Sequence, residues 1–134
     1  MRKVFTGVTA LLTLAVIGQF FLAGRGAFSA NFDPHRGLGY VTIFLSAAVL
    51  LVGALARMPG RILGMFGLVV GLLVLQPMTV TLAEGRDDMS TGGLVLGLHA
   101  VNGAVILGIL MRIIHTSRAV SVPAHHTAPT TARS

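Results

Sequence analysis

The sequence predicts an all-α integral membrane protein, a bundle of four helices that cross the bilayer up, down, up and down. Three observations predict it: 54% of the 134 residues are hydrophobic, only 10% are charged, and the chain contains four apolar runs of about 20 residues. Soluble domains contain about 25% charged residues, and about 20 helical residues cross the roughly 30 Å hydrocarbon core of a bilayer. The length favours one domain, so we assign residues 1–118 to a single transmembrane domain.

The four predicted helices span about residues 4–24, 37–56, 62–83 and 91–114. None contains Asp, Glu or Lys, and Arg112 lies in the last turn of the fourth, where its long side chain reaches the interface. The runs are continuously apolar and lack the alternation of polar and apolar residues that marks membrane β-strands. Helices are therefore the predicted spanning elements.

The residues before the first two runs bear on where these helices begin. Met1, Arg2 and Lys3 precede the first run in the manner of a secretory signal, but signal cores contain about 7 to 15 apolar residues and this run is longer. We expect the segment to remain, because its length suits a spanning helix; its cleavage would leave three helices. For the second helix, Asp33 is the expected N-cap and Pro34 the first helical residue.

The later connections predict a hairpin and a tail. The link from Arg57 to Arg61 is short and contains Pro59 and Gly60, a strong turn signal, so the second and third helices are expected to be antiparallel neighbours. Residues 119–134 are rich in Ser, Thr, Pro, Ala and His, and they have no apolar period. They are predicted to form a flexible cytoplasmic tail, in which the adjacent histidines at 125 and 126 are solvated rather than metal-binding.

The basic residues predict that both termini lie inside, because cytoplasmic segments carry an excess of Lys and Arg. Seven of the ten lie on the terminal side of the bundle and three, at positions 25, 36 and 86, on the opposite side. The expected location is a cell membrane, of the bacterial plasma-membrane type. The seven inner residues are Arg2, Lys3, Arg57, Arg61, Arg112, Arg118 and Arg133.

Several function classes are excluded by what the sequence lacks. There is no cysteine, which removes disulfides, thiolate nucleophiles and zinc fingers. The net charge of +6 is divided between apolar runs instead of forming the patch that nucleic acid requires. No carboxylate lies inside an apolar run to couple proton-driven export, and no hydrolase or transferase motif is present.

Glycines at four-residue spacing mark faces where membrane helices approach closely. The third helix contains the pairs Gly60/Gly64 and Gly67/Gly71, and the fourth begins with Gly93/Gly97. Packing inside the bundle is sufficient to explain them. The same faces also offer contacts for a homo-oligomer.

Polar residues within the apolar runs are the candidate functional residues, because polar groups in hydrocarbon are costly and usually face the bundle interior. They are Gln19, Gln76, His99 and Asn102, together with His35 at the head of the second helix. All are in the outer half of the bundle on the predicted topology. This placement indicates one asymmetric site and no path through the membrane.

The two histidines share a pattern, His35-x-x-x-Gly39 and His99-x-x-x-Gly103, on two helices that run in the same direction. Each glycine lies one turn deeper on the same face as its histidine, which leaves bare backbone for a large flat group. Two imidazoles from parallel helices in an apolar bundle are the ingredients of a bis-histidine haem b site.

Other polar residues complete the predicted site. Arg25, Arg36 and Arg86 are expected to pair with the haem propionates. Asn102, or either glutamine, is expected to orient a ligand imidazole through its second nitrogen.

On these residues the chain resembles the four-helix haem b membrane cytochromes, including the cytochrome b561-like proteins and each half of haem A synthase. It also resembles small uncharacterised bacterial four-helix membrane proteins in which the segments FDPHRGLGYV and LHAVNG recur. The resemblance covers roughly residues 1–115. It implies axial ligation by His35 and His99 and electron transfer with a redox partner protein or a quinone. Since only two histidines are available at the membrane, one haem is the most it implies.

Two alternatives stay open at this stage. The polar cluster can lock a haem-free accessory or scaffold subunit, with His99 bonded to Gln76, Gln19 or a backbone carbonyl. It can also bind a small lipophilic ligand such as a quinone. The helix lengths favour these alternatives, because His35 lies 22 residues before Arg57 and His99 only 16 before His115, a predicted depth offset of about 9 Å.

Overall fold

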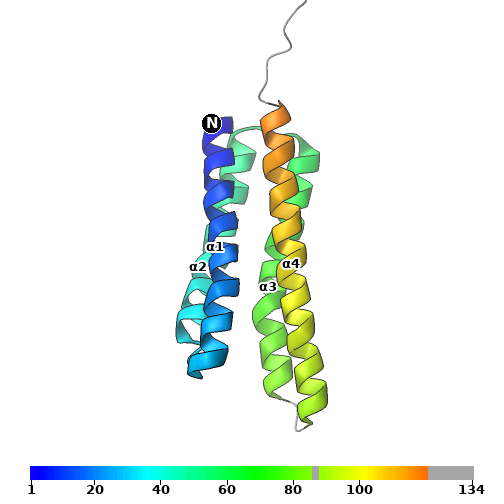
Figure 1. Cartoon of the computed structure of the whole chain (residues 1–134). Coiled ribbons are helices and arrows are strands. Elements are labelled where there is room, and N and C mark those ends of the chain that lie inside the picture. Colours follow the sequence, from blue (N-terminus) through cyan, green and yellow to red (C-terminus); the bar gives the residue numbers. More distant parts are fainter. Residues whose placement is uncertain (86–87, 121–134) are drawn as a thin grey trace, which may run out of the picture.

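A computed structural model describes residues 1–85 and 88–120. These contain four helices and no strand: α1 (Arg2–Ser29), α2 (Asp33–Leu55), α3 (Gly60–Glu84) and α4 (Met89–Val120). The predicted all-α four-helix architecture is confirmed (Figure 1). Each helix is long and apolar enough to cross a membrane, and the chain is a multi-pass membrane protein.

The helices extend beyond their predicted ends, except that α2 ends at Leu55, one residue short of its prediction. Apolar runs mark only the part of a helix that lies in hydrocarbon, whereas backbone hydrogen bonding continues into the polar flanks. The largest difference is in α4, which continues to Val120, so the tail prediction is wrong for residues 119 and 120. The rest of the predicted tail, including both of its histidines, lies outside the described residues.

The start of α2 differs from prediction by one residue. Phe32 is the N-cap and Asp33 is the first helical residue. The side-chain Oδ1 of Asn31 accepts a hydrogen bond from the backbone N–H of Asp33 at 2.9 Å. This bond satisfies one of the amide groups that every helix N-terminus leaves without a helical partner.

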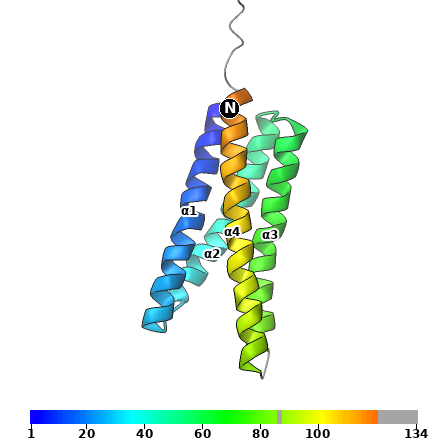
Figure 2. The same cartoon turned by 45° about the vertical axis from the view of Figure 1, so that its right-hand side comes forward.

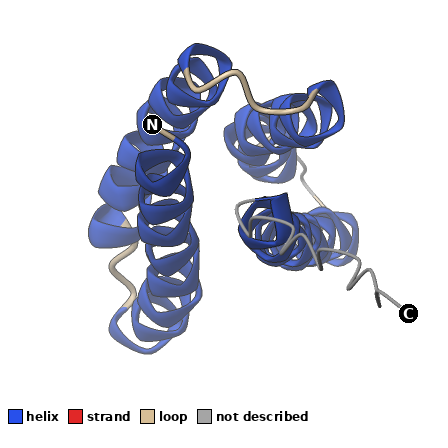
Figure 3. Ribbon diagram, turned by 90° about the horizontal axis from the view of Figure 1, so that it is seen from above, coloured by secondary structure: helices blue, strands red, loops and turns tan. Residues whose placement is uncertain are grey.

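The bundle consists of two hairpins, α1–α2 and α3–α4, packed side by side (Figure 3). The backbones of neighbouring helices approach closely around the ring, including the predicted α2–α3 pair, whereas the diagonal pairs α1/α3 and α2/α4 meet only through side chains. We call the end with the chain termini and the α2–α3 connection the terminal end, and the opposite end the loop end. The two hairpins diverge toward the loop end (Figures 1 and 2).

The apolar core lies toward the terminal end. Phe5 and Phe66 are fully buried there, with ring centroids 6.0 Å apart and an edge-on geometry. Leu12, Ile106 and Leu110 are also fully buried. This core holds the two hairpins together at the terminal end, and they diverge from there toward the loop end.

Polarity is distributed as expected for a protein in lipid. Large apolar side chains point outward, with Phe44 75% and Phe21 72% exposed. Hydroxyls such as those of Thr9, Thr13 and Ser46 are buried, and each donates to a carbonyl of its own helix. Small hydroxyl residues inside and apolar residues outside are typical of membrane bundles.

The glycine pairs of α3 do not pack inside the bundle, so that interpretation is wrong. A Cβ atom added at Gly60, Gly64, Gly67 or Gly71 would have no atom outside the local helix within 4 Å. All four are exposed, as are Gly93 and Gly97 of α4. Interior close packing occurs instead at Gly53, against Phe5. The outward glycine faces keep the homo-oligomer hypothesis open.

Candidate functional site

All four helices enclose a cavity of about 430 Å³ on the loop-end side of the core. Core residues Val16, Leu73 and Ile106 line its deeper part. The lining includes seven of the ten predicted site residues. These residues are Gln19, His35, Arg36, Gly39, Gln76, His99 and Gly103, together with Tyr40, Thr42, Thr81 and Glu84, which the sequence did not single out.

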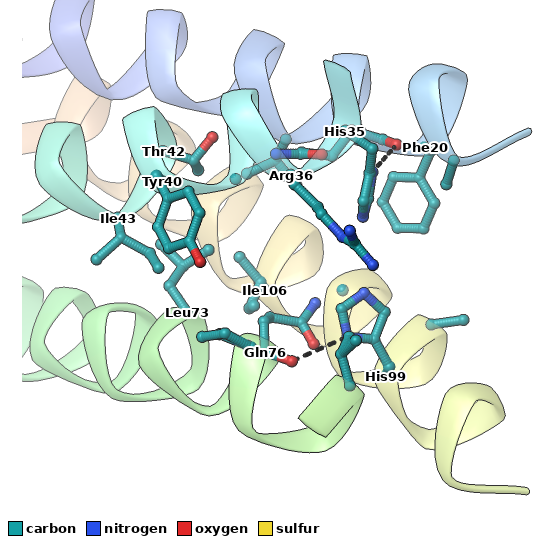
Figure 4. Close-up of a pocket in the computed structure, with 18 of the residues that line it drawn as sticks. Phe20, His35, Arg36, Tyr40, Thr42, Ile43, Leu73, Gln76, His99 and Ile106 are labelled. Carbon is teal, nitrogen blue, oxygen red and sulfur yellow. Dashed lines mark hydrogen bonds between the residues drawn. The ribbon is translucent and has the colours of Figure 1, made fainter. Parts of the chain in front are cut away.

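The two histidines face each other across this cavity. His35 comes from the first turns of α2 and His99 from α4, the diagonally opposite helix, and their ring centroids lie 6.1 Å apart. Figure 4 shows both rings pointing into the space between the hairpins. The predicted depth offset is wrong, because α4 runs past His115: His99 lies 21 residues before Val120, and His35 lies 20 residues before Leu55.

His35 is oriented by the neighbouring helix of its own hairpin. Its Nδ1 lies 3.0 Å from the main-chain carbonyl oxygen of Gln19 on α1. A carbonyl oxygen only accepts, so Nδ1 carries the proton and donates it. In the neutral imidazole Nε2 is then the unprotonated nitrogen, and its lone pair is available to a ligand.

His99 repeats this arrangement in the second hairpin. Its Nδ1 lies 3.2 Å from the carbonyl oxygen of Gln76 on α3 and 3.1 Å from Oγ1 of Thr79. The Thr79 hydroxyl itself donates to the Gln76 carbonyl at 2.7 Å, so both oxygens accept from Nδ1. In its neutral form His99 therefore also has an unprotonated Nε2. Figure 4 shows its hydrogen bond to Gln76.

The glutamine side chains lie against the glycines of the His-x-x-x-Gly pattern. A methyl group on Gly39 would be 3.3 Å from Nε2 of Gln19, and one on Gly103 would be 3.3 Å from Nε2 of Gln76. In both glutamines Oε1 is buried without a hydrogen-bond partner among the described residues. The two hairpins thus contribute equivalent half-sites, each consisting of a histidine, its carbonyl acceptor, a glycine and a glutamine amide whose oxygen is buried.

The prediction that a side-chain amide of Asn102 or of a glutamine orients a ligand imidazole is wrong. Asn102 donates from Nδ2 to the main-chain carbonyl of Leu72 at 3.0 Å and bonds to neither histidine. The glutamines act through their main-chain carbonyls and not through their amides. The hydrogen bond of Asn102 joins α4 to α3, which is the helix-locking role that polar residues commonly have in membranes.

The predicted arginine cluster is only partly assembled. Arg36 lines the cavity, and its Nη2 forms an ion pair with Oε1 of Glu84 at 3.2 Å. Arg25 is exposed and is not part of the lining. Arg86 lies outside the described residues.

The ligand set is limited to the two imidazoles. Among residues 1–85 and 88–120, no group of three or more His, Cys, Asp or Glu side chains can hold a metal ion. A metal at this place would need its other ligands from elsewhere.

The chain is similar to a family of unknown function (DUF6220), which matches residues 19–82. The match contains the whole α1–α2 half-site and Gln76, whereas His99 and Gly103 lie beyond it. No curated protein and no solved structure matches the chain.

Proposed function

We propose that this protein binds one b-type haem between α2 and α4, that His35 and His99 would hold it, and that it transfers electrons at the membrane. The single observation that carries the proposal is the oriented histidine pair. Two rings from diagonally opposed helices lie 6.1 Å apart, and each already has its Nδ1 engaged by a carbonyl.

The separation of the rings suits a single metal atom between them. Two metal–nitrogen bonds of about 2 Å, with an imidazole radius of about 1 Å at each end, put the centroids about 6 Å apart. The observed centroid distance is 6.1 Å. A metal-binding histidine usually donates its other ring N–H to a carbonyl or carboxylate, which fixes the tautomer and raises ligand basicity.

The number of protein ligands favours a metal held by a macrocycle. Two imidazoles would supply two nitrogen ligands, and the described residues offer no third ligand. A porphyrin supplies the remaining four nitrogens. The cavity volume of about 430 Å³ lies within the usual range of about 300–1,000 Å³ for ligand pockets, and its deeper part is apolar.

Bound haem would supply one-electron redox chemistry. The chain itself has three tasks in this account. His35 and His99 hold the group, the carbonyls of Gln19 and Gln76 fix the ligand rings, and the core below the cavity excludes water. If both imidazoles hold the group, the expected activity is electron transfer.

The test is a visible spectrum of the protein purified in detergent from haem-replete cells. We expect a Soret band and sharp reduced α and β bands at one haem per chain. His35→Ala and His99→Ala should each lose these features, whereas His115→Ala, an exposed residue of α4 away from the cavity, should keep them. A colourless wild-type protein would refute haem binding and leave the scaffold or lipophilic-ligand alternatives.

The proposal includes a topology in which the loop end faces outward and both termini are cytoplasmic, in a bacterial plasma membrane. The excess of Lys and Arg at the terminal end supports this orientation. A redox partner protein or a quinone would then exchange electrons near the outer face. Reporter fusions at Asn31 and Arg118 should show opposite locations, with Arg118 inside.

A further inference from the structure

The mouth of the cavity is spanned by the ion pair of Arg36 and Glu84. Arg36 follows His35 directly in the first turns of α2, and Glu84 is the last residue of α3. Both line the cavity, and their side chains are 59% and 62% exposed. Figure 4 shows Arg36 reaching from α2 into the space between the hairpins.

This pair differs in its topology from the other polar contacts of the site. The hydrogen bond of His35 stays within the α1–α2 hairpin, and that of His99 stays within the α3–α4 hairpin. The pair of Arg36 and Glu84 joins one hairpin to the other at their diverging end. Arg36 follows His35 in the sequence and also lines the cavity, so its guanidinium lies near any group that the histidines hold.

We propose that Arg36 binds a carboxylate of the ligand and that Glu84 is an internal competitor which limits the affinity of the site. This inference rests on the proposed function, since haem b carries two propionates on one edge of the ring. A guanidinium binds one carboxylate much as it binds another, through a planar pair of N–H donors. The exchange of Glu84 for a propionate therefore conserves the interaction.

Because the ion pair is exposed, its replacement by a ligand carboxylate costs little free energy. Exposed ion pairs contribute little to stability, because water screens the charges and two flexible side chains must be ordered. Glu84 therefore lowers ligand affinity without preventing binding. For a ligand with the same ring but no carboxylate, Arg36 should not raise the binding affinity.

The experiment titrates two porphyrins into the full-length protein in detergent micelles and follows the Soret band. The first is haem b, and the second is its dimethyl ester, which has the same iron and ring but no free carboxylate. The variants are Glu84→Gln, Arg36→Gln and the double variant. The matched control is Asp33→Asn, which removes an exposed acid at the same end that does not line the cavity.

We expect Glu84→Gln to tighten haem binding by up to about fivefold, the upper value of an exposed ion pair, and to leave ester binding unchanged. Arg36→Gln should weaken haem binding and abolish the effect of Glu84→Gln, while Asp33→Asn has no effect. The inference fails if Glu84→Gln shifts both porphyrins equally, shifts neither, or is matched by Asp33→Asn. Those outcomes leave the proposed function intact, whereas the absence of any histidine-dependent porphyrin spectrum refutes both.

Discussion

The glycine of the second half-site offers a sharp test of the cavity geometry. A methyl group on Gly103 would lie 3.2 Å from Cζ of Phe20 and 3.3 Å from Nε2 of Gln76, closer than the roughly 3.5–4.0 Å optimum for such contacts. At Gly97, on the same helix, an added methyl group would have no atom outside the local helix within 4 Å. The two glycines therefore form a matched pair for the same substitution.

Alanine replaces glycine in a helix with a gain of about 0.5–1 kcal/mol at either position. Only Gly103→Ala also overfills a packed site, which costs about 1–3 kcal/mol. Because the helix term cancels between the variants, Gly103→Ala should be less stable than Gly97→Ala by about 1–3 kcal/mol. Denaturant unfolding in mixed micelles, followed by circular dichroism, measures this difference in the free energy of unfolding.

Gly103→Ala should also weaken haem binding, since the methyl group narrows the wall of the proposed site, whereas Gly97→Ala should leave it unchanged. Equal stabilities of the two variants would show that Gly103 does not pack against Phe20 and Gln76. The geometry described for the second half-site would then be wrong.

Three further predictions concern residues away from the histidines. Gly53→Ala should destabilise the protein by about 1–3 kcal/mol, because the methyl group would lie 2.8 Å from the buried ring of Phe5; unfolding titrations check this, and wild-type stability would contradict it. Asn102→Leu should lower the free energy of unfolding by about 0.6–1.7 kcal/mol, the range for interhelical hydrogen bonds in membranes. The haem spectrum should be unchanged, and its loss would show that Asn102 acts at the ligand. The hydroxyls of Thr91 and Ser90 and their backbone N–H groups hold the pKa of Asp88 well below its usual range. Stability from this lowered pKa is present above the unfolded value of about 4 and is lost as the pH falls, so the excess stability of wild type over Asp88→Ala should shrink in acid. A constant difference in pH-dependent unfolding would contradict a stabilising role for these hydrogen bonds.

Much of the architecture could be predicted from the sequence because the bilayer imposes a simple rule. A run of about 20 apolar residues must form a helix to satisfy its backbone groups, so four runs give four helices. The same rule makes His99 conspicuous, since a polar side chain in hydrocarbon is costly. The repeated His-x-x-x-Gly pattern then pointed to His35 and to both glycines, all of which line one cavity.

The atoms that orient the histidines could not be predicted, because every residue carries a main-chain carbonyl. Side-chain type drew attention to the amides of Gln19 and Gln76, whereas the carbonyls of the same residues accept the bonds. Helix rotation decides which atoms face the neighbour, and the apolar runs constrain it weakly. For the same reason the glycine spacing of α3 did not reveal that Gly64 and Gly67 face outward.

Glu84 was missed for a different reason. Its partner Arg36 is 48 residues away in the sequence, and no local pattern joins them. The pairing depends on how the two hairpins diverge at the loop end, which is a property of the whole bundle.

The central claim is that His35 and His99 bind the same iron atom. Electron paramagnetic resonance of the oxidised, haem-loaded protein tests it most directly, because six-coordinate bis-imidazole iron is low-spin and five-coordinate iron is high-spin. We expect a low-spin signal from wild type and from His115→Ala, and loss of that signal in both His35→Ala and His99→Ala. A low-spin signal that survives either substitution would contradict the claim.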